Sequence, residues 1–204
     1  MGVARRSIGA QRNPESEKAI LEAARELLVE EGLAGFSIEA VARRAHAGKP
    51  TIYRWWPSKT ALLLAVYEGL KEQMVEPDTG TLEGDIGGFI GNLLRFWRDT
   101  PAGPVFRSIL AEAPTNPDAS TSFDAYHLER RARTARRFAR HGLDSAIAEL
   151  LVELIVNYCW GRLLSGQLDV DEREISRVAA TLARGIGAAQ TSAGAHTAPA
   201  PPLG

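Results

Sequence analysis

Polar, cationic and aromatic side chains crowd one short stretch of the sequence, FSIEAVARRAHAGKPTIYRWWPSK at residues 36–59. Its second half places a threonine, a tyrosine, an arginine and two tryptophans on a predicted short helix, with Lys49 before them and Lys59 after them. Ile52 and Trp56 lie four residues apart and share one helical face, which leaves the polar groups on the other faces. These groups suit the base edges and phosphates of DNA better than a packed core. The pattern predicts an exposed helix from Lys49 to Trp56 that enters a major groove.

The elements that position this stretch are predicted to be helices throughout, because apolar residues recur at helical spacing between Pro and Gly breaks. No alternating run or hairpin turn predicts a strand. Asn13, Ser37 and Ser58 are the expected N-caps of helices near the N-terminus. The fold class is therefore all-α, with about nine helices. We expect them at residues 14–31, 38–45, 49–56, 58–75, 83–99, 104–113, 118–140, 144–165 and 171–188.

Three sequence blocks between Ala19 and about Tyr67 form a recognisable pattern. They are Leu28-x3-Gly32, Phe36-Ser37-Ile38-x2-Val41-Ala42 and Lys49-x-Thr51-Ile52-Tyr53-x2-Trp56-Pro57-Ser58-Lys59-x2-Leu62. The pattern resembles the tetracycline-repressor (TetR/AcrR) family of regulators. The resemblance implies an N-terminal three-helix helix-turn-helix DNA-binding domain, followed by a helical-bundle ligand-binding and dimerisation domain. It also implies contacts to bases or phosphates from Ser37, Lys49, Pro50, Thr51, Tyr53, Arg54, Trp55 and Lys59.

Two positions depart from the family pattern. His46 stands in the turn where the family usually has glycine, a place that calls for a positive φ, which His tolerates better than most residues. Gly48 replaces a frequent serine; it still makes an acceptable cap, but one hydroxyl contact to phosphate is lost. Two alternatives stay open: Trp55 covers the edge of the core, and Lys59 is simply solvated.

Charge and composition narrow the function classes. The chain of 204 residues has a net charge of −1, yet residues 1–60 carry 10 Lys and Arg against 7 Asp and Glu, so the basic end is the end with the recognition stretch. The single Cys159 allows no intramolecular disulfide. Neither a signal peptide nor an apolar run of about 20 residues is present, so we expect a cytoplasmic protein with no membrane partner. No metal-ligand spacing or nucleophile motif predicts a metal, a cofactor or an enzyme.

Four regions are predicted along the chain. Residues 1–12 form a flexible basic arm that either lies in a minor groove or is solvated. Residues 13–60 form the helix-turn-helix domain. Residues 61–189 form the ligand-binding and dimerisation domain. The Ala- and Pro-rich residues 190–204 form a disordered tail.

The larger domain carries the predicted partner sites. Helices 144–165 and 171–188 are apolar enough to form a four-helix bundle across a two-fold axis. The expected interface residues are Leu151, Ile155, Leu163, Val178, Leu182 and Ile186. Candidate ligand-lining residues, each of which could instead be ordinary core, are Phe89, Trp97, Phe106, Phe123, Tyr126, His127 and Tyr158. Six arginines are expected to form the solvated face of helix 118–140, namely Arg130, Arg131, Arg133, Arg136, Arg137 and Arg140.

Together these patterns predict a sequence-specific transcriptional regulator. We expect a homodimer that binds a palindromic operator in double-stranded DNA and represses until a small-molecule effector, which the sequence does not identify, releases it. Activation instead of repression stays open. The alternative is a helical ligand-binding or scaffold protein without DNA binding.

Overall fold

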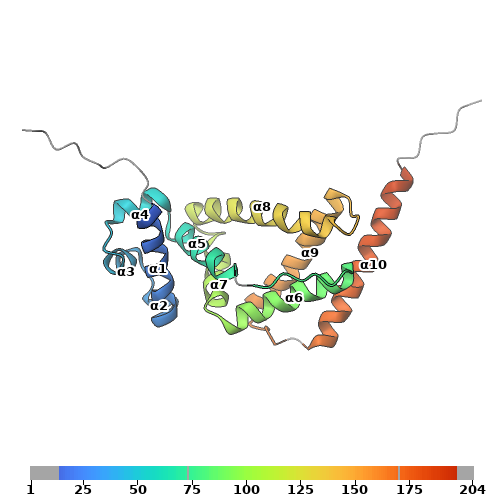
Figure 1. Cartoon of the computed structure of the whole chain (residues 1–204), viewed down its shortest axis with the longest axis horizontal. Coiled ribbons are helices and arrows are strands. Elements are labelled where there is room, and N and C mark those ends of the chain that lie inside the picture. The colour runs from blue at the N-terminus through green and yellow to red at the C-terminus, as the bar shows by residue number, and fades with distance from the viewer. Residues whose placement is uncertain (1–13, 73, 170, 197–204) are drawn as a thin grey trace, which may run out of the picture.

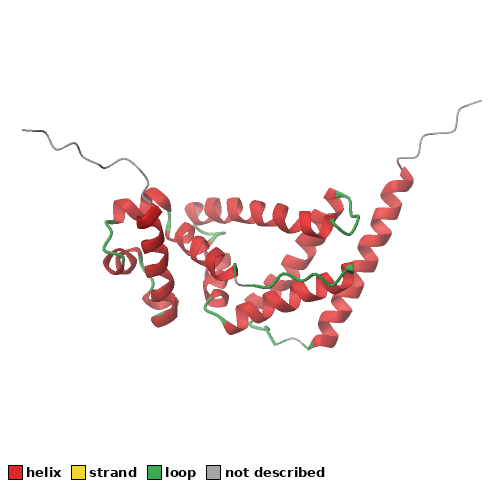
Figure 2. Cartoon of the chain, in the orientation of Figure 1, coloured by secondary structure: helices red, strands yellow, loops and turns green. Residues whose placement is uncertain are grey.

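The computed structural model describes residues 14–72, 74–169 and 171–196, the last of them with side chains as far as residue 191. All regular structure in these ranges is helical and none is strand, which confirms the all-α prediction (Figure 2). The helices are α1 Pro14–Glu30, α2 Gly32–Gly35, α3 Ile38–Arg44, α4 Lys49–Trp55, α5 Lys59–Lys71, α6 Leu82–Asp99, α7 Ala102–Glu112, α8 Pro117–Ala139, α9 Ser145–Leu164 and α10 Glu172–His196.

The short helices near the N-terminus begin where polar caps are available. The Ser37 Oγ accepts a hydrogen bond from the Ala40 amide at 3.1 Å, and the Ser58 Oγ accepts one from the Ala61 amide at 3.0 Å. Each bond satisfies a first-turn amide that would otherwise lack a partner. His46, in the turn between α3 and α4, has φ of 50° as expected. Asn13, the third expected cap, lies outside the described residues.

Apart from shifts of one or two residues, three features differ from the expectation. The one-turn α2 is not among the expected helices, and α5 ends at Lys71, before the expected end near Val75. The Val75 carbonyl accepts instead from the Asn92 side chain at 2.7 Å. Helix α10 continues to His196, which moves the start of the predicted tail, because Ala-rich sequence meets no proline there. Residues 197–204 and the predicted arm at 1–12 lie outside the described residues.

The chain is arranged as a small N-terminal group of helices and a larger bundle (Figure 1). Helix α1 packs on α3, and α3 packs on α4 around one apolar core. That core includes Ile20, Leu27, Val41, Ile52 and Trp56, all at most 7% exposed. Helix α5 contacts α1 on one side and α7 and α8 on the other, so it joins the two groups. In the bundle α8 packs on α9, α9 on α6, and α6 on α10.

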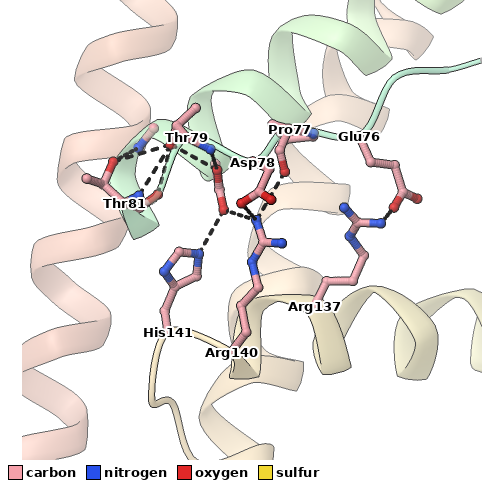
Figure 3. A network of polar contacts seen from close by, with 10 residues as sticks. Glu76, Pro77, Asp78, Thr79, Thr81, Arg137, Arg140 and His141 are labelled. Carbon is pink, nitrogen blue, oxygen red and sulfur yellow. Dashed lines mark hydrogen bonds and ion pairs between the residues drawn. The ribbon is translucent and has the colours of Figure 1, made fainter.

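A polar network fixes the connection between α5 and α6 to the C-terminal end of α8 (Figure 3). Asp85, 2% exposed, accepts hydrogen bonds from the Thr79 amide at 2.7 Å and the Thr79 hydroxyl at 2.9 Å. Its other oxygen lies 2.5 Å from the Arg140 guanidinium and 2.8 Å from the His141 Nε2. Burial works to raise the pKa of Asp85, but these hydrogen bonds hold it well below its ordinary value.

Candidate DNA interface and interior cavity

Helix α4 has one buried side and one exposed side, as the sequence predicts. Ile52 is fully buried, and Trp56, just after the helix, is 7% exposed. Both belong to the N-terminal core, so they fix the rotation of the helix about its axis. The remaining predicted contact residues in this segment therefore reach the surface to different degrees. Lys49, Pro50, Tyr53, Arg54 and Lys59 are exposed, and Ser37, Thr51 and Trp55 are half-buried.

The cationic side chains of this surface are held by specific neighbours. The Lys49 ammonium forms an ion pair with Glu39 of α3, and this hydrogen bond raises the pKa of Lys49 and lowers that of Glu39. The Lys59 Nζ lies 5.8 Å from the centre of the Phe36 ring, a cation–π distance. Contact of the eight residues with DNA stays a prediction, and the sequence did not indicate the acidic partner on α3.

Side chains of α5, α6, α7, α8 and α9 line a partly open cavity of about 40 Å³ within the bundle, which is called the interior cavity below. Five of the seven candidate ligand residues line it: Phe89, Trp97, Phe106, Tyr126 and His127. Phe123 is not in the wall but stacks on His127, with ring centres 5.8 Å apart. Tyr158 points elsewhere, because its hydroxyl donates to Glu174 of α10 at 3.1 Å. The sequence missed Tyr67, Lys71, Trp160 and the arginines described below.

Aromatic rings form much of the cavity wall. Phe106 stacks on Tyr67, with ring centres 4.6 Å apart and planes 22° apart, and on Trp97 at 5.7 Å. The buried Trp97 Nε1 donates to the Tyr67 hydroxyl at 3.0 Å, which satisfies both groups. The Trp160 ring also belongs to the wall, and its centre lies 5.1 Å from the centre of the His127 ring. These contacts give the cavity flat apolar walls.

Part of the cavity wall is cationic, which corrects the expected solvated face of α8. Arg130 and Arg131 line the cavity, and Arg137 and Arg140 pair with Glu76 and Asp85, whereas Arg133 and Arg136 are exposed as expected. Helical spacing could have predicted this wall, because residues 123, 126, 127, 130, 131 and 134 share one face of α8. The charges of Arg130 and Arg131 instead favoured a solvated face, since arginines usually lie in water.

The predicted dimer residues divide into two groups. Leu151, Ile155, Leu163 and Ile186 are at most 4% exposed and belong to the chain's own core, so their contact with a partner stays a prediction. Val178 and Leu182 are half-buried on α10. The exposed leucines of α9 lie one residue before or after the predicted ones. They are Leu150, Leu154 and Leu164, at 43%, 43% and 53% exposure.

The described residues also bear on membrane and metal sites. Among them, no helix has the length and apolar character to cross a bilayer. No group of three or more His, Cys, Asp or Glu side chains in the same part of the chain could hold a metal ion.

Comparison with known proteins agrees with the geometry. The family model for bacterial regulatory proteins of the tetR family matches residues 20–66, and the model for the tetracyclin repressor-like C-terminal domain matches residues 76–182. An uncharacterised HTH-type transcriptional regulator of Bacillus subtilis, YdeS, is 25% identical over 185 residues, which are 87% of this chain and 93% of that protein.

Solved structures show the same fold. The TetR-family transcription regulator SCO0332 is 30% identical, with a TM-score of 0.70 over 84% of this chain and 98% of its own. The multidrug binding protein EbrR, in complex with imidazole, is 18% identical, with a TM-score of 0.59 over 84% of this chain and 96% of its own. The resemblance seen in the sequence is confirmed, and the chain belongs to the TetR family of bacterial transcriptional regulators.

Proposed function

We propose that this regulator binds a palindromic operator as a homodimer, through α4, and is released by a small-molecule effector that enters the interior cavity. The observation that carries the proposal is the two-sided α4. Ile52 and Trp56 fix its inner side in the core, while Lys49, Tyr53 and Arg54 are exposed on its outer side. A major groove admits a helix presented in this way, with basic and hydroxyl groups available for phosphates and base edges.

Dimerisation through α9 and α10 would supply the second recognition helix. Leu150, Leu154 and Leu164 form an exposed apolar stripe on α9, and Val178 and Leu182 lie half-buried on α10. Two such helices from each protomer can bury this surface in a four-helix bundle. The two copies of α4 must then lie roughly 34–36 Å apart to read consecutive major grooves.

Effector action requires a change in that spacing. The cavity of about 40 Å³ has room for water but not for a drug-sized molecule, so an effector must displace the walls. Helix α5 supplies part of the wall and also contacts α1 of the DNA-binding domain. The effector would therefore bind the conformation unsuited to DNA more tightly, and by linkage DNA would weaken effector binding equally. Repression is the expected sign, because an occupied operator blocks polymerase.

The proposal extends to the location of the protein in the cell and to the question of catalysis. We propose a cytoplasmic protein, because its target is DNA, and no catalytic role, because no nucleophile–base pair or metal group lies in the cavity. The imidazole-bound EbrR supports a ligand-binding role for this fold.

Selection of bound sequences from random double-stranded DNA tests the proposal directly. The full-length protein should enrich a palindrome with half-sites about one helical turn apart. Tyr53→Ala and Lys59→Ala should weaken binding to every site, whereas Lys49→Ala and Arg54→Ala should also change the preferred sequence. Arg136→Ala, an exposed change near the far end of α8, is the matched control and should bind as the wild type does. Recovery of no enriched sequence would favour the scaffold alternative.

A further inference from the structure

The interior cavity has three cationic side chains in its wall and no carboxylate. Lys71 comes from α5, and Arg130 and Arg131 come from α8. An apolar cavity surrounded by aromatic rings is an unfavourable place for cations that have no counter-charge beside them. The residues that line the cavity supply no anionic partner for these cations, so any counter-charge must come from residues outside the wall or from a ligand.

The chain compensates two of these charges from outside the wall. Glu68 pairs with Arg130 at 3.5 Å, and Glu149 and Glu153 pair with Arg131 at 3.5 and 3.2 Å. Even so, the buried Nε atoms of both arginines have no hydrogen-bond partner among the described residues. A buried donor without a partner is unfavourable, so a ligand that accepts a hydrogen bond from it gains an advantage.

Lys71 is the cation that remains without an ion-pair partner in the described part of the chain. The wall beside it offers the Tyr67 ring, whose centre lies 5.9 Å from the Lys71 Nζ. One carboxylate placed against Lys71 would supply the partner that it lacks. Because three carboxylates already lie beside the two arginines, a dianion would leave an excess of negative charge. A carboxylate also matches the planar donors of an arginine.

We propose that the effector is an aromatic carboxylate, with the carboxylate against Lys71 and Arg130 and the flat body among Trp97, Phe106 and Trp160. This inference rests on the proposed function, since it names the chemical class of the effector for the same cavity. Neutral or cationic aromatic compounds of the same shape should bind more weakly, because they leave these cations without a counter-charge.

The protonation of Lys71 predicts, in addition, that effector affinity depends on pH. Burial, together with the positive charge of Arg130, lowers the pKa of Lys71 to about 7. The charged or titratable groups that act on it are Glu68 of α5, Arg130 and Arg133 of α8, and Cys159 of α9, and the Tyr67 ring lies beside it. A bound carboxylate would raise this pKa, so binding takes up a proton. Affinity should then fall roughly fivefold between pH 7 and pH 8.

Calorimetry and tryptophan fluorescence on the full-length protein without DNA test the proposal. The probes are benzoate, salicylate, 2-naphthoate and indole-3-acetate, each compared with its neutral amide. At least one acid should bind about tenfold more tightly than its amide, with the pH dependence described above. Lys71→Met should abolish both the preference and the pH dependence, and Arg130→Gln should reduce the preference. Arg136→Gln, on the exposed face of the same helix, should change neither.

Equal or tighter binding of the amides would overturn the proposal, and so would failure of all four acids to bind. Circular dichroism of each variant separates loss of binding from loss of folding, and Arg130→Gln supplies a second variant should Lys71→Met fail to fold. The proposed function is tested separately by operator selection. If an acid binds but no operator is enriched, the DNA-binding proposal fails while the assignment of the cavity stands. If an operator is enriched but no acid binds, only this inference fails.

Discussion

Replacement of Asp85 by alanine removes the buried acceptor that holds the α5–α6 connection to the end of α8. The carboxylate is 2% exposed and accepts from the Thr79 amide, the Thr79 hydroxyl, Arg140 and His141 at 2.5–2.9 Å. The variant leaves the Thr79 amide and two basic side chains without this acceptor. We expect loss of folding stability, since a buried donor without a partner keeps its desolvation penalty.

The size of the expected stability loss depends on how exposed the partners of Asp85 are. Removing one member of a buried ion pair typically lowers stability by about 3–5 kcal/mol. The Arg140 side chain is 37% exposed and can be hydrated, and it keeps Asp78 at 3.0 Å, so the lower limit of that range applies. We therefore expect Asp85→Ala to lower the free energy of unfolding by about 3 kcal/mol. For a chain of this size, that corresponds to a fall in Tm of roughly 6–12 °C.

Asp78 provides a matched control, because it contacts the same arginine from an exposed position. Its side chain is 76% exposed, so Asp78→Ala should lower stability by less than about 1 kcal/mol. Urea unfolding at one fixed protein concentration measures both variants, since dimerisation would otherwise shift the midpoint. Equal effects of the two substitutions would refute this reasoning, because burial would then not determine the strength of the network.

The pH dependence gives an independent check on the same group. A carboxylate whose pKa is lowered on folding contributes stability above its unfolded pKa of about 3.9, and loses that contribution as pH falls toward the folded value. Wild-type stability should therefore fall more steeply than that of Asp85→Ala as pH decreases below about 4.

Three further predictions concern other parts of the molecule. Glu39→Gln should strengthen DNA binding by about two- to tenfold in a mobility-shift assay, because it frees Lys49 and removes a negative charge from the DNA-facing surface. Leu154→Glu should convert the proposed dimer to monomer in sedimentation measurements, because it places a charge in the exposed apolar stripe; a dimer unchanged by this substitution would exclude α9 from the interface. Gly103→Ala should lower stability by about 1–3 kcal/mol in urea unfolding, since the added Cβ would lie 2.1 Å from the Trp97 carbonyl oxygen; unaltered stability would show that the two helices separate easily.

The buried and exposed sides of α4 could be predicted in detail because their determinants are local. Ile52 and Trp56 are four residues apart, so helical geometry alone places them on one face and the polar groups elsewhere. The turn at His46 is likewise a local requirement for positive φ. The partner of Lys49 could not be predicted in this way, because Glu39 lies on a different helix and reaches it only through the packing of α3 on α4.

The bundle was harder to predict because helices there are covered on more than one side. Helix α9 is apolar nearly all round, so periodicity does not distinguish the face that packs on α6 and α8 from the face left exposed. Leu151 and Leu154 differ by three positions, yet the first is buried and the second is 43% exposed. For α8, the charge of Arg130 and Arg131 suggested solvent, and only the packing of α5 and α9 around them reveals the cavity.

Helix α5 joins the two halves of the proposed mechanism. Its 13 residues span about 20 Å, with Lys59 at the DNA-facing end and Lys71 in the cavity wall. The start of the helix is held by Thr60, whose hydroxyl donates to Glu112 at 3.2 Å, and by Ser58, which lies 3.2 Å from Ser122. A helix this short moves nearly as a rigid rod, so displacement of Lys71 by a ligand must be taken up at these contacts or passed to α1. We therefore expect effector binding and operator binding to compete through the position of α5.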